Sequence, residues 1–222
     1  MLGVLGRPTL SLVLLFQPDL APDAPLLPTL DAALALCERV AIVDTTQLTG
    51  LHATPIGLLA DAIPDHAILN GRPGTGGYRS PKSIVAAGGY VVRQGDAGTD
   101  VLLIFRRGAW DLPKGKLDGK ETIRACAKRE VCEEVGIKRL RVVRPLGSTL
   151  HGYPLTKRYA VKTTYWYRME TAQTVFKPQA EEDIERVEWV PLAEAIERLG
   201  FETLRAHAYL IRDLLGEQRP GG

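Results

Sequence analysis

The stretch GKLDGKETIRACAKREVCEEVGI at residues 115–137 decides how the second half of this chain is expected to fold. Its glutamates Glu130, Glu133 and Glu134 stand at i, i+3 and i+4, which places all three carboxylates on one face of an α-helix. Apolar residues recur every four positions from Ile123 to Val135, and this periodicity predicts an amphipathic helix. The glycine that follows at position 136 predicts the end of that helix.

The three glutamates raise an electrostatic question, because like charges on one helix face repel one another. Lys138 lies four residues after Glu134, but it stands beyond Gly136, where the helix is expected to end. We therefore expect that nothing in the local sequence neutralises the cluster. A Mg²⁺ ion, which prefers oxygen ligands, would do so. The alternative is a solvated acidic helix face, and the spacing alone leaves both interpretations open.

Apolar stretches on both sides of residues 115–137 predict a sheet. Residues 83–93 and 101–107 are rich in β-branched side chains and are separated by turn-forming residues, which predicts a hairpin. Further strands are expected at 141–146, 158–169 and 186–190, and helices at 191–199 and 202–215. This order of elements predicts a mixed α/β or α+β sandwich with helices on the faces of the sheet.

The composition is that of an ordinary globular protein and excludes disordered and collagen-like classes: 45% of the 222 residues are hydrophobic and 24% are charged. The net charge of +2 provides no overall field that would select nucleic acid or an anionic membrane, so we expect neither as a partner. Cys37, Cys126 and Cys132 are too few and too irregularly spaced for a disulfide framework, which favours a cytoplasmic protein. The apolar run at residues 9–16 is too short to span a membrane.

The composition changes near residue 82. Residues 1–82 hold nine of the fifteen prolines, and the glycine- and proline-rich residues 70–77 predict a linker. We expect residues 1–82 to form a small N-terminal α/β region, with strands at 11–16 and 40–43 and a helix at 31–39. No motif in this region indicates a function. Residues 83–222 are expected to form the second domain.

Residues 115–137 resemble the signature of the Nudix hydrolases without a departure. The fixed positions of that signature are matched by Gly115, Glu121, Arg129, Glu130, Glu133, Glu134 and Gly136, with the aliphatic Ile137 after them. The neighbouring sequences WDLPKGK at 110–116 and AAGG at 86–89 also resemble this family. The resemblance covers residues 83–216 and implies a Nudix-type α/β/α sandwich with a mixed sheet.

The resemblance also implies a set of metal-binding and catalytic residues. The positions that match the family's ligands for Mg²⁺ (or Mn²⁺) are Glu130, Glu133 and Glu134, joined by the carbonyl oxygen of Gly115. Arg129 and Glu121 match a pair that fixes the loop and orients a ligand glutamate. Members of the family differ in whether the general base lies in this motif or in a later loop. Glu182 matches the loop position, and we favour it.

Local positive charge suits a polyphosphate substrate. The residues expected to contact the substrate are Lys114, Lys116, Arg106, Lys157, Arg158, His151 and Tyr153. The resemblance implies Mg²⁺-dependent hydrolysis of a phosphoanhydride in a nucleoside-diphosphate-linked substrate, foremost a nucleoside or dinucleoside polyphosphate. The alternatives are a diphosphoinositol-polyphosphate or sugar-nucleotide hydrolase and, in another class, a non-catalytic nucleotide-sensing Nudix protein. Homodimers are common in the family, so a homodimer is one expected state.

Overall fold

The computed structural model describes residues 12–15, 24–27, 40–43, 79, 82–96, 98–155 and 159–216. The chain divides into two compact units: Met1–Ile84 with Leu150–Lys162, and Val85–Thr149 with Thr163–Gly222. The division into residues 1–82 and 83–222 that the sequence suggests stays a prediction. Within the described residues, no helix combines the length and the apolarity that a membrane span requires.

The first unit contains three short strands, β1 (Leu12–Leu15), β2 (Ala24–Leu27) and β3 (Val40–Val43). Strand β1 pairs antiparallel with both β2 and β3. Strands β1 and β3 fall where the sequence predicts strands, whereas β2 was not predicted. The helix predicted at 31–39 and the linker predicted at 70–77 lie outside the described residues.

The second unit is built on a mixed sheet with the strand order β10-β5-β4-β9-β8. These strands are β4 (Lys82–Gly95), β5 (Gly98–Arg106), β8 (Arg141–Pro154), β9 (Tyr159–Glu170) and β10 (Ile184–Pro191). The predicted hairpin is present, because β4 and β5 pair antiparallel from Val92↔Val101 to Gly95↔Gly98. Two short strands extend this arrangement: β6 (Ala109–Asp111) pairs with β5, and β7 (Lys114–Lys116) pairs with β4.

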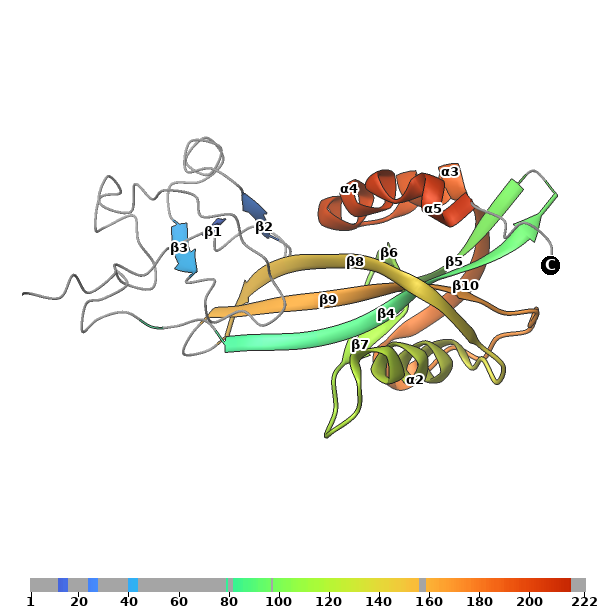
Figure 1. Cartoon of the computed structure of the whole chain (residues 1–222), viewed down its shortest axis with the longest axis horizontal. Helices are drawn as coiled ribbons and strands as arrows, with labels where there is room; N and C mark the ends of the chain where they lie inside the picture. Colours follow the sequence, from blue (N-terminus) through green and yellow to red (C-terminus); the bar gives the residue numbers. More distant parts are fainter. Residues whose placement is uncertain are drawn as a thin grey trace, which may run out of the picture. The chain divides into compact units, whose positions relative to one another are not determined.

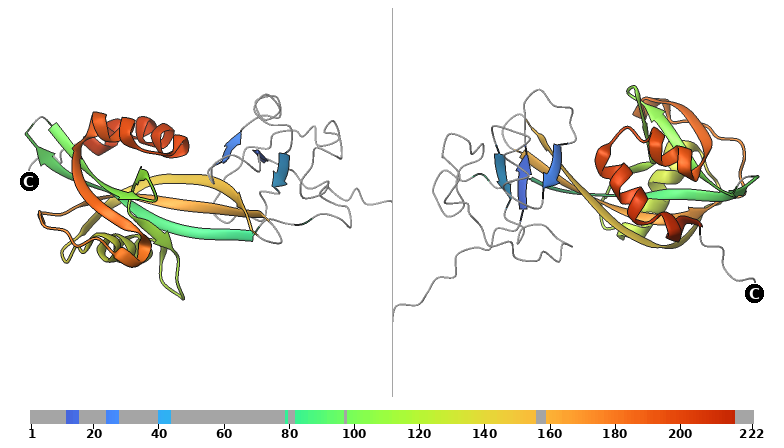
Figure 2. Two further views of the ribbon diagram at one scale, coloured as in Figure 1. Left: turned by 180° about the vertical axis from the view of Figure 1, so that it is seen from behind. Right: turned by 90° about the horizontal axis from the view of Figure 1, so that it is seen from above.

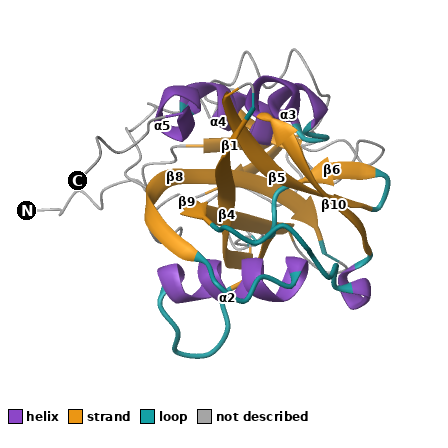
Figure 3. Cartoon of the chain, turned by 90° about the vertical axis from the view of Figure 1, so that its right-hand side faces the viewer, coloured by secondary structure: helices purple, strands orange, loops and turns teal. Residues whose placement is uncertain are grey.

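Helices cover both faces of this sheet, as Figures 1 and 2 show. Helix α2 (Ile123–Val135) lies on one face. The opposite face carries α3 (Leu192–Arg198), α4 (Glu202–Leu210) and α5 (Arg212–Gly216), and Figure 3 shows the three layers side on. Two apolar clusters fill the layers, one beneath α2 and one beneath α3 to α5. This arrangement confirms the predicted α/β sandwich with helices on the sheet faces.

Helix α2 begins and ends where its sequence predicts. The hydroxyl of Thr122 accepts a hydrogen bond from the backbone N–H of Ala125 at 3.2 Å, which caps the first turn. Gly136 ends the helix in the left-handed region at φ +70°, where a side chain would be strained. Val131 and Val135 are fully buried against the sheet. Burying an aliphatic side chain of this size contributes about 1.5–3 kcal/mol, so packing fixes the orientation of the glutamates on the same helix.

The structure corrects the expectation at three places in the second unit. The helix predicted at 202–215 is interrupted at Ile211, whose backbone (φ −103°, ψ 7°) is not helical, so α4 and α5 are separate. Strand β8 continues eight residues beyond the predicted 141–146. A single 3₁₀ turn, η4 (Ala180–Glu182), precedes β10 and was not predicted.

Candidate active site

Strand β7 brings the backbone of Gly115 against the first glutamate of α2. A Cβ atom added to Gly115 would lie 1.8 Å from Oε2 of Glu130, so only glycine permits this approach. The strand is held by its pairing with β4, in which Gly115 faces Ala87. The close approach places the main chain of the loop beside the Glu130 carboxylate.

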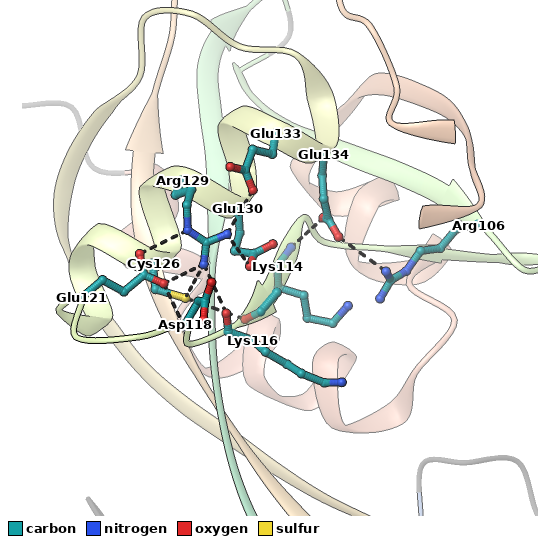
Figure 4. Close-up of polar contacts among 11 residues, drawn as sticks. Arg106, Lys114, Lys116, Asp118, Glu121, Cys126, Arg129, Glu130, Glu133 and Glu134 are labelled. Carbon is teal, nitrogen blue, oxygen red and sulfur yellow. Dashed lines mark hydrogen bonds and ion pairs between the residues drawn. The ribbon is translucent and has the colours of Figure 1, made fainter. Parts of the chain in front are cut away.

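Arg129 joins the acidic residues of the motif into one network, drawn in Figure 4. Its guanidinium donates hydrogen bonds to Glu121 at 2.6 and 3.1 Å, to Glu130 at 2.8 Å and to Glu133 at 3.0 Å. It also donates to the carbonyl oxygen of Lys116 at 3.2 Å, which ties the helix to the preceding loop. The positioning that the sequence assigns to Arg129 and Glu121 therefore has a geometric basis.

This network corrects our expectation that nothing in the local sequence neutralises the glutamates. Arg129 stands four residues before Glu133 and next to Glu130, and one nitrogen of its guanidinium contacts both carboxylates. The compensating side chain precedes the glutamates in the sequence, whereas Lys138 follows them. The hydrogen bonds from Arg129 and from the backbone N–H of Asp118 lower the pKa of Glu121 to about 2.

Glu134 differs from the other two glutamates because its side chain is almost fully buried, at 2% exposure. Its carboxylate accepts a hydrogen bond from the backbone N–H of Lys114 at 2.8 Å and lies 3.5 Å from a guanidinium nitrogen of Arg106. Burial raises the pKa of Glu134 to about 7, although the charges of Lys114 and Arg106 oppose this rise. Glu133, by contrast, has half of its side chain exposed. The three carboxylates thus stand in three different environments.

Asp111 is a site residue that the sequence analysis missed. It is buried and accepts hydrogen bonds from the Lys114 ammonium at 2.7 Å, from the Arg106 guanidinium at 2.9 and 3.1 Å, and from the backbone N–H of Leu112 at 2.8 Å. Burial acts to raise the pKa of Asp111, but Lys114 and Arg106 hold it below its ordinary value. Nothing in the sequence around Asp111 distinguishes this buried and paired acid from an exposed one.

The predicted substrate-binding cations have different surroundings. Lys114 and Arg106 direct their charges to the buried carboxylates of Asp111 and Glu134, and Lys114 is only 8% exposed. Lys116, at the end of β7, is exposed. His151 and Tyr153 lie in the part of β8 that belongs to the first unit. Lys157 and Arg158 lie outside the described residues.

Glu182, the predicted general base, lies on an exposed 3₁₀ turn beside the motif. The loop before it is attached to the end of α2, since the N–H of Gln179 donates to the carbonyl of Glu134 at 2.9 Å. On its other side, Asp183 forms an ion pair with Arg107 of the β5–β6 turn at 2.9 Å. Burial raises the pKa of Glu130, Arg129 opposes this rise, and the charge of Glu182 adds to it.

The oxygen atoms around Gly115 suit a hard divalent cation. Glu130 and Glu133 already share one cationic group, the Arg129 guanidinium, and the Glu130 carboxylate occupies the place that a side chain of Gly115 would take. Carboxylate and carbonyl oxygens are the ligands that Mg²⁺ takes in proteins. Among the described residues, however, no three acidic, histidine or cysteine side chains already converge on one point as a metal site. The donors beside Gly115 are oxygen atoms of the kind that Mg²⁺ binds, so their chemistry fits the implied ion.

A mixed sheet between helical layers, with a glutamate-bearing helix beside a glycine loop, defines an α/β/α sandwich. Within that class, the chain belongs to the NUDIX domain family, whose model matches residues 82–214. The match confirms the family that residues 115–137 resemble. Members of this family are pyrophosphohydrolases, and the complete motif in α2 and its loop is the part of the chain that this class of enzyme requires.

Individual proteins are also similar to parts of this chain. The chain is 32% identical over 147 residues to "Putative mutator protein MutT4" of Mycobacterium tuberculosis, an alignment that covers 62% of this chain and 58% of that protein. Two solved structures are more distant. An Ap4A hydrolase from C. elegans in a binary complex has 18% identity and a TM-score of 0.49, with 60% of this chain and 97% of that chain covered. A MutT protein from Methanosarcina mazei has 19% identity and a TM-score of 0.48, with 63% and 99% covered.

Proposed function

We propose that this protein hydrolyses a phosphoanhydride bond in a nucleoside-diphosphate-linked substrate, with a nucleoside or dinucleoside polyphosphate as the first choice. The observation that carries the proposal is the network of Arg129 with Glu121, Glu130 and Glu133 beside the glycine loop. A merely solvated acidic helix face would not need a guanidinium shared by three carboxylates. The Lys-Gly-Lys sequence at 114–116 resembles members that act on dinucleoside polyphosphates, oxidised nucleoside triphosphates or diphosphoinositol polyphosphates, so it fits the first choice and one of the alternatives.

The implied metal is Mg²⁺, with Mn²⁺ as the alternative, and the residues that would hold it are Glu130, Glu133, Glu134 and the carbonyl of Gly115. When bound, such an ion neutralises phosphate oxygens and lowers the pKa of a coordinated water. The chain's own residues supply the remaining parts of the reaction. Arg129 orients Glu130 and Glu133, and Lys116 is exposed where it can bind a substrate phosphate.

We assign the general base to Glu182. Its carboxylate is exposed and makes no ion pair with a described residue, so its oxygen atoms are free to accept a proton from an attacking water. Glu134 is the alternative within the motif, but its side chain is only 2% exposed, so it is less accessible to water than Glu182. Replacing Glu182 by Gln tests this choice, since an unchanged rate would move the role of base to the motif.

The decisive experiment measures release of phosphate, pyrophosphate and nucleoside monophosphate from a substrate panel. The panel contains nucleoside triphosphates, dinucleoside polyphosphates, sugar nucleotides and inositol pyrophosphates, each with Mg²⁺, with Mn²⁺ and with a chelator. We expect turnover of a nucleoside or dinucleoside polyphosphate that the chelator abolishes. Turnover of an inositol pyrophosphate or a sugar nucleotide alone would select the alternative substrate. Tight binding of a nucleotide with no turnover of any member would instead identify a sensing protein.

The cellular setting belongs to the same proposal. We infer a cytoplasmic protein from the small number of irregularly spaced cysteines, of which Cys126 and Cys132 are free thiols. A homodimer is the oligomeric state that the family suggests, and no partner other than the small-molecule substrate is required. Sedimentation analysis of the full chain would test the oligomeric state directly.

A further inference from the structure

A cationic pocket of about 1070 Å³ lies in the second unit, where β4 ends, β5 begins and the loop between α2 and β8 passes the end of β9. Its lining contains six cationic side chains: Arg93, Lys128, Lys138, Arg139, Arg141 and Arg168. Glu170 supplies the one carboxylate among the lining residues. None of these residues belongs to the catalytic, metal-binding or substrate-binding residues expected from the sequence.

Only part of this positive charge is compensated by neighbouring acids. Arg93 forms an ion pair with Asp100 at 3.0 Å, and Arg141 and Arg168 both contact Glu170. Three further cations, Lys128, Lys138 and Arg139, are exposed and form no ion pair with any described residue. Because the whole chain carries a net charge of only +2, the excess in this pocket is a local concentration.

The loop that carries Lys138 and Arg139 is held in place by side-chain hydrogen bonds. Gln173 accepts from the N–H of Lys138 at 3.0 Å and donates to the carbonyl of Gly136 at 2.8 Å. The hydroxyl of Thr171 donates to the carbonyl of Arg139 at 2.8 Å. The backbone that positions the two uncompensated cations is therefore fixed before any ligand binds, which reduces the entropic cost of binding.

The pocket is separate from the candidate active site. Lys128 stands two residues before Glu130 on α2, and successive helical residues are about 100° apart, so the two side chains project from nearly opposite sides of the helix. None of the residues that contact Arg129 or Glu134 lines the pocket. A ligand held here would leave the glutamates of α2 accessible.

We propose that this pocket is a second anion site that binds an oligophosphate, meaning a chain of three or more linked phosphates. Three uncompensated cations on two segments match a compact ligand with many anionic oxygens, and arginine and lysine are the side chains that bind phosphate. No aromatic ring is present among the lining residues, so the pocket has no surface on which a nucleobase would stack. The ligand is either free oligophosphate or the phosphate chain of a nucleotide.

Calorimetric titration of the full chain with sodium tripolyphosphate, in a metal-free buffer with chelator, tests this proposal. The pocket variant is Lys138→Gln/Arg139→Gln. The matched control is Lys177→Gln/Arg212→Gln, which removes the same charge from exposed positions outside the lining. We expect the pocket variant to weaken binding about tenfold or more, since two charge-assisted contacts are lost, and the control to leave the affinity unchanged. The affinity of the wild type should fall as salt is raised.

Further titrations distinguish free oligophosphate from a nucleotide as the ligand. They also distinguish the pocket from the candidate active site. Tripolyphosphate binding equal to that of a nucleoside triphosphate would identify the phosphate chain alone as the ligand, and much tighter triphosphate binding would favour the nucleotide. A Glu130→Gln/Glu133→Gln variant should bind tripolyphosphate as the wild type does. Equal losses in the pocket and control variants, or no saturable binding to the wild type, would overturn the proposal. So would tighter binding of a single-stranded oligonucleotide that requires Lys138 and Arg139.

Discussion

At the scale of single residues, the three glutamates of α2 lie in different environments. Substituting them one at a time can therefore distinguish their roles. Glu133 is half exposed, and Glu130 lies against Gly115, whereas Glu134 is buried between the backbone of Lys114 and Arg106. Glu134 therefore tests whether a buried carboxylate of the motif serves catalysis or only the fold.

Glu134→Gln should lower turnover by about 100-fold or more while the protein stays folded. Gln keeps an oxygen that accepts the N–H of Lys114, and burial penalises the charge that the substitution removes, so the free energy of unfolding should not fall. The measurements are kcat with Mg²⁺ and the thermal unfolding midpoint. Glu185→Gln, at an exposed position of β10, is the matched control and should leave both values unchanged. Near-normal turnover of Glu134→Gln would remove Glu134 from the metal-binding set.

The candidate site was predictable from the sequence to the extent that it is local. The helix brings Arg129 close to Glu130 and Glu133, because all three residues lie within about one turn of α2. Their spacing in the sequence alone therefore predicts this part of the site. The Asp111 cluster was not predictable in this way, because its partner Arg106 and the adjacent Glu134 belong to a strand and a helix that meet only in the folded sheet. A buried acid also has the same sequence appearance as an exposed one. Lys114 stands only three residues after Asp111, but the two residues belong to different strands, β7 and β6. Their spacing in the sequence therefore did not predict that they pair.

At the scale of elements, periodicity predicted α2 to the residue and most strands to within a few positions. The prediction failed at Ile211, where the apolar stripe of the last helix continues although the backbone does not. Both Leu204 and Leu215 are buried against the same cluster, so the hydrophobic pattern is satisfied on both sides of the break. A pattern that reports burial cannot distinguish one helix from two that share a face.

Helix α4 carries a buried histidine that should make stability depend on pH. The hydrogen bonds of His207 suit a neutral ring: one ring nitrogen lies 2.9 Å from the Tyr90 hydroxyl and the other 3.1 Å from the carbonyl of Leu146. The carbonyl can only accept, so Tyr90 donates to the first nitrogen, and the ring needs no second proton. Burial lowers the pKa of His207 below its ordinary value of 6.5, against the smaller opposing effect of the Leu146 carbonyl.

The free energy of unfolding should therefore fall as the pH drops below about 6.5, because His207 binds a proton in the unfolded chain at a pH at which it stays unprotonated in the native protein. The loss should level off below the folded pKa, with about 1.4 kcal/mol lost for each unit of the pKa shift. Denaturant unfolding between pH 8 and pH 5 measures this, with His207→Gln as the reference that lacks the titrating group. Parallel pH profiles for the two proteins would show that His207 does not contribute.

At the scale of the whole molecule, near-neutral net charge conceals a separation of charge around α2. Carboxylates gather on the side that faces the glycine loop, and uncompensated cations gather in the pocket on the other side. The sequence total of +2 gave no indication of this arrangement, because composition sums charges without placing them. The described residues of the second unit contain both apolar clusters in full, and every member lies between residues 87 and 215.

Deleting residues 1–82 should consequently leave a folded protein with metal-dependent activity. The deletion removes β1, β2 and β3 but spares both apolar clusters, and the family match begins at residue 82. A domain of this size with its own core folds independently as a rule. We expect a cooperative thermal transition and turnover of the substrate that the full chain prefers. The pairing of Ala24 with Gly152 is lost, so the end of β8 should become more accessible to proteases than in the full chain. A truncated chain without a cooperative transition would show instead that residues 1–82 complete the core.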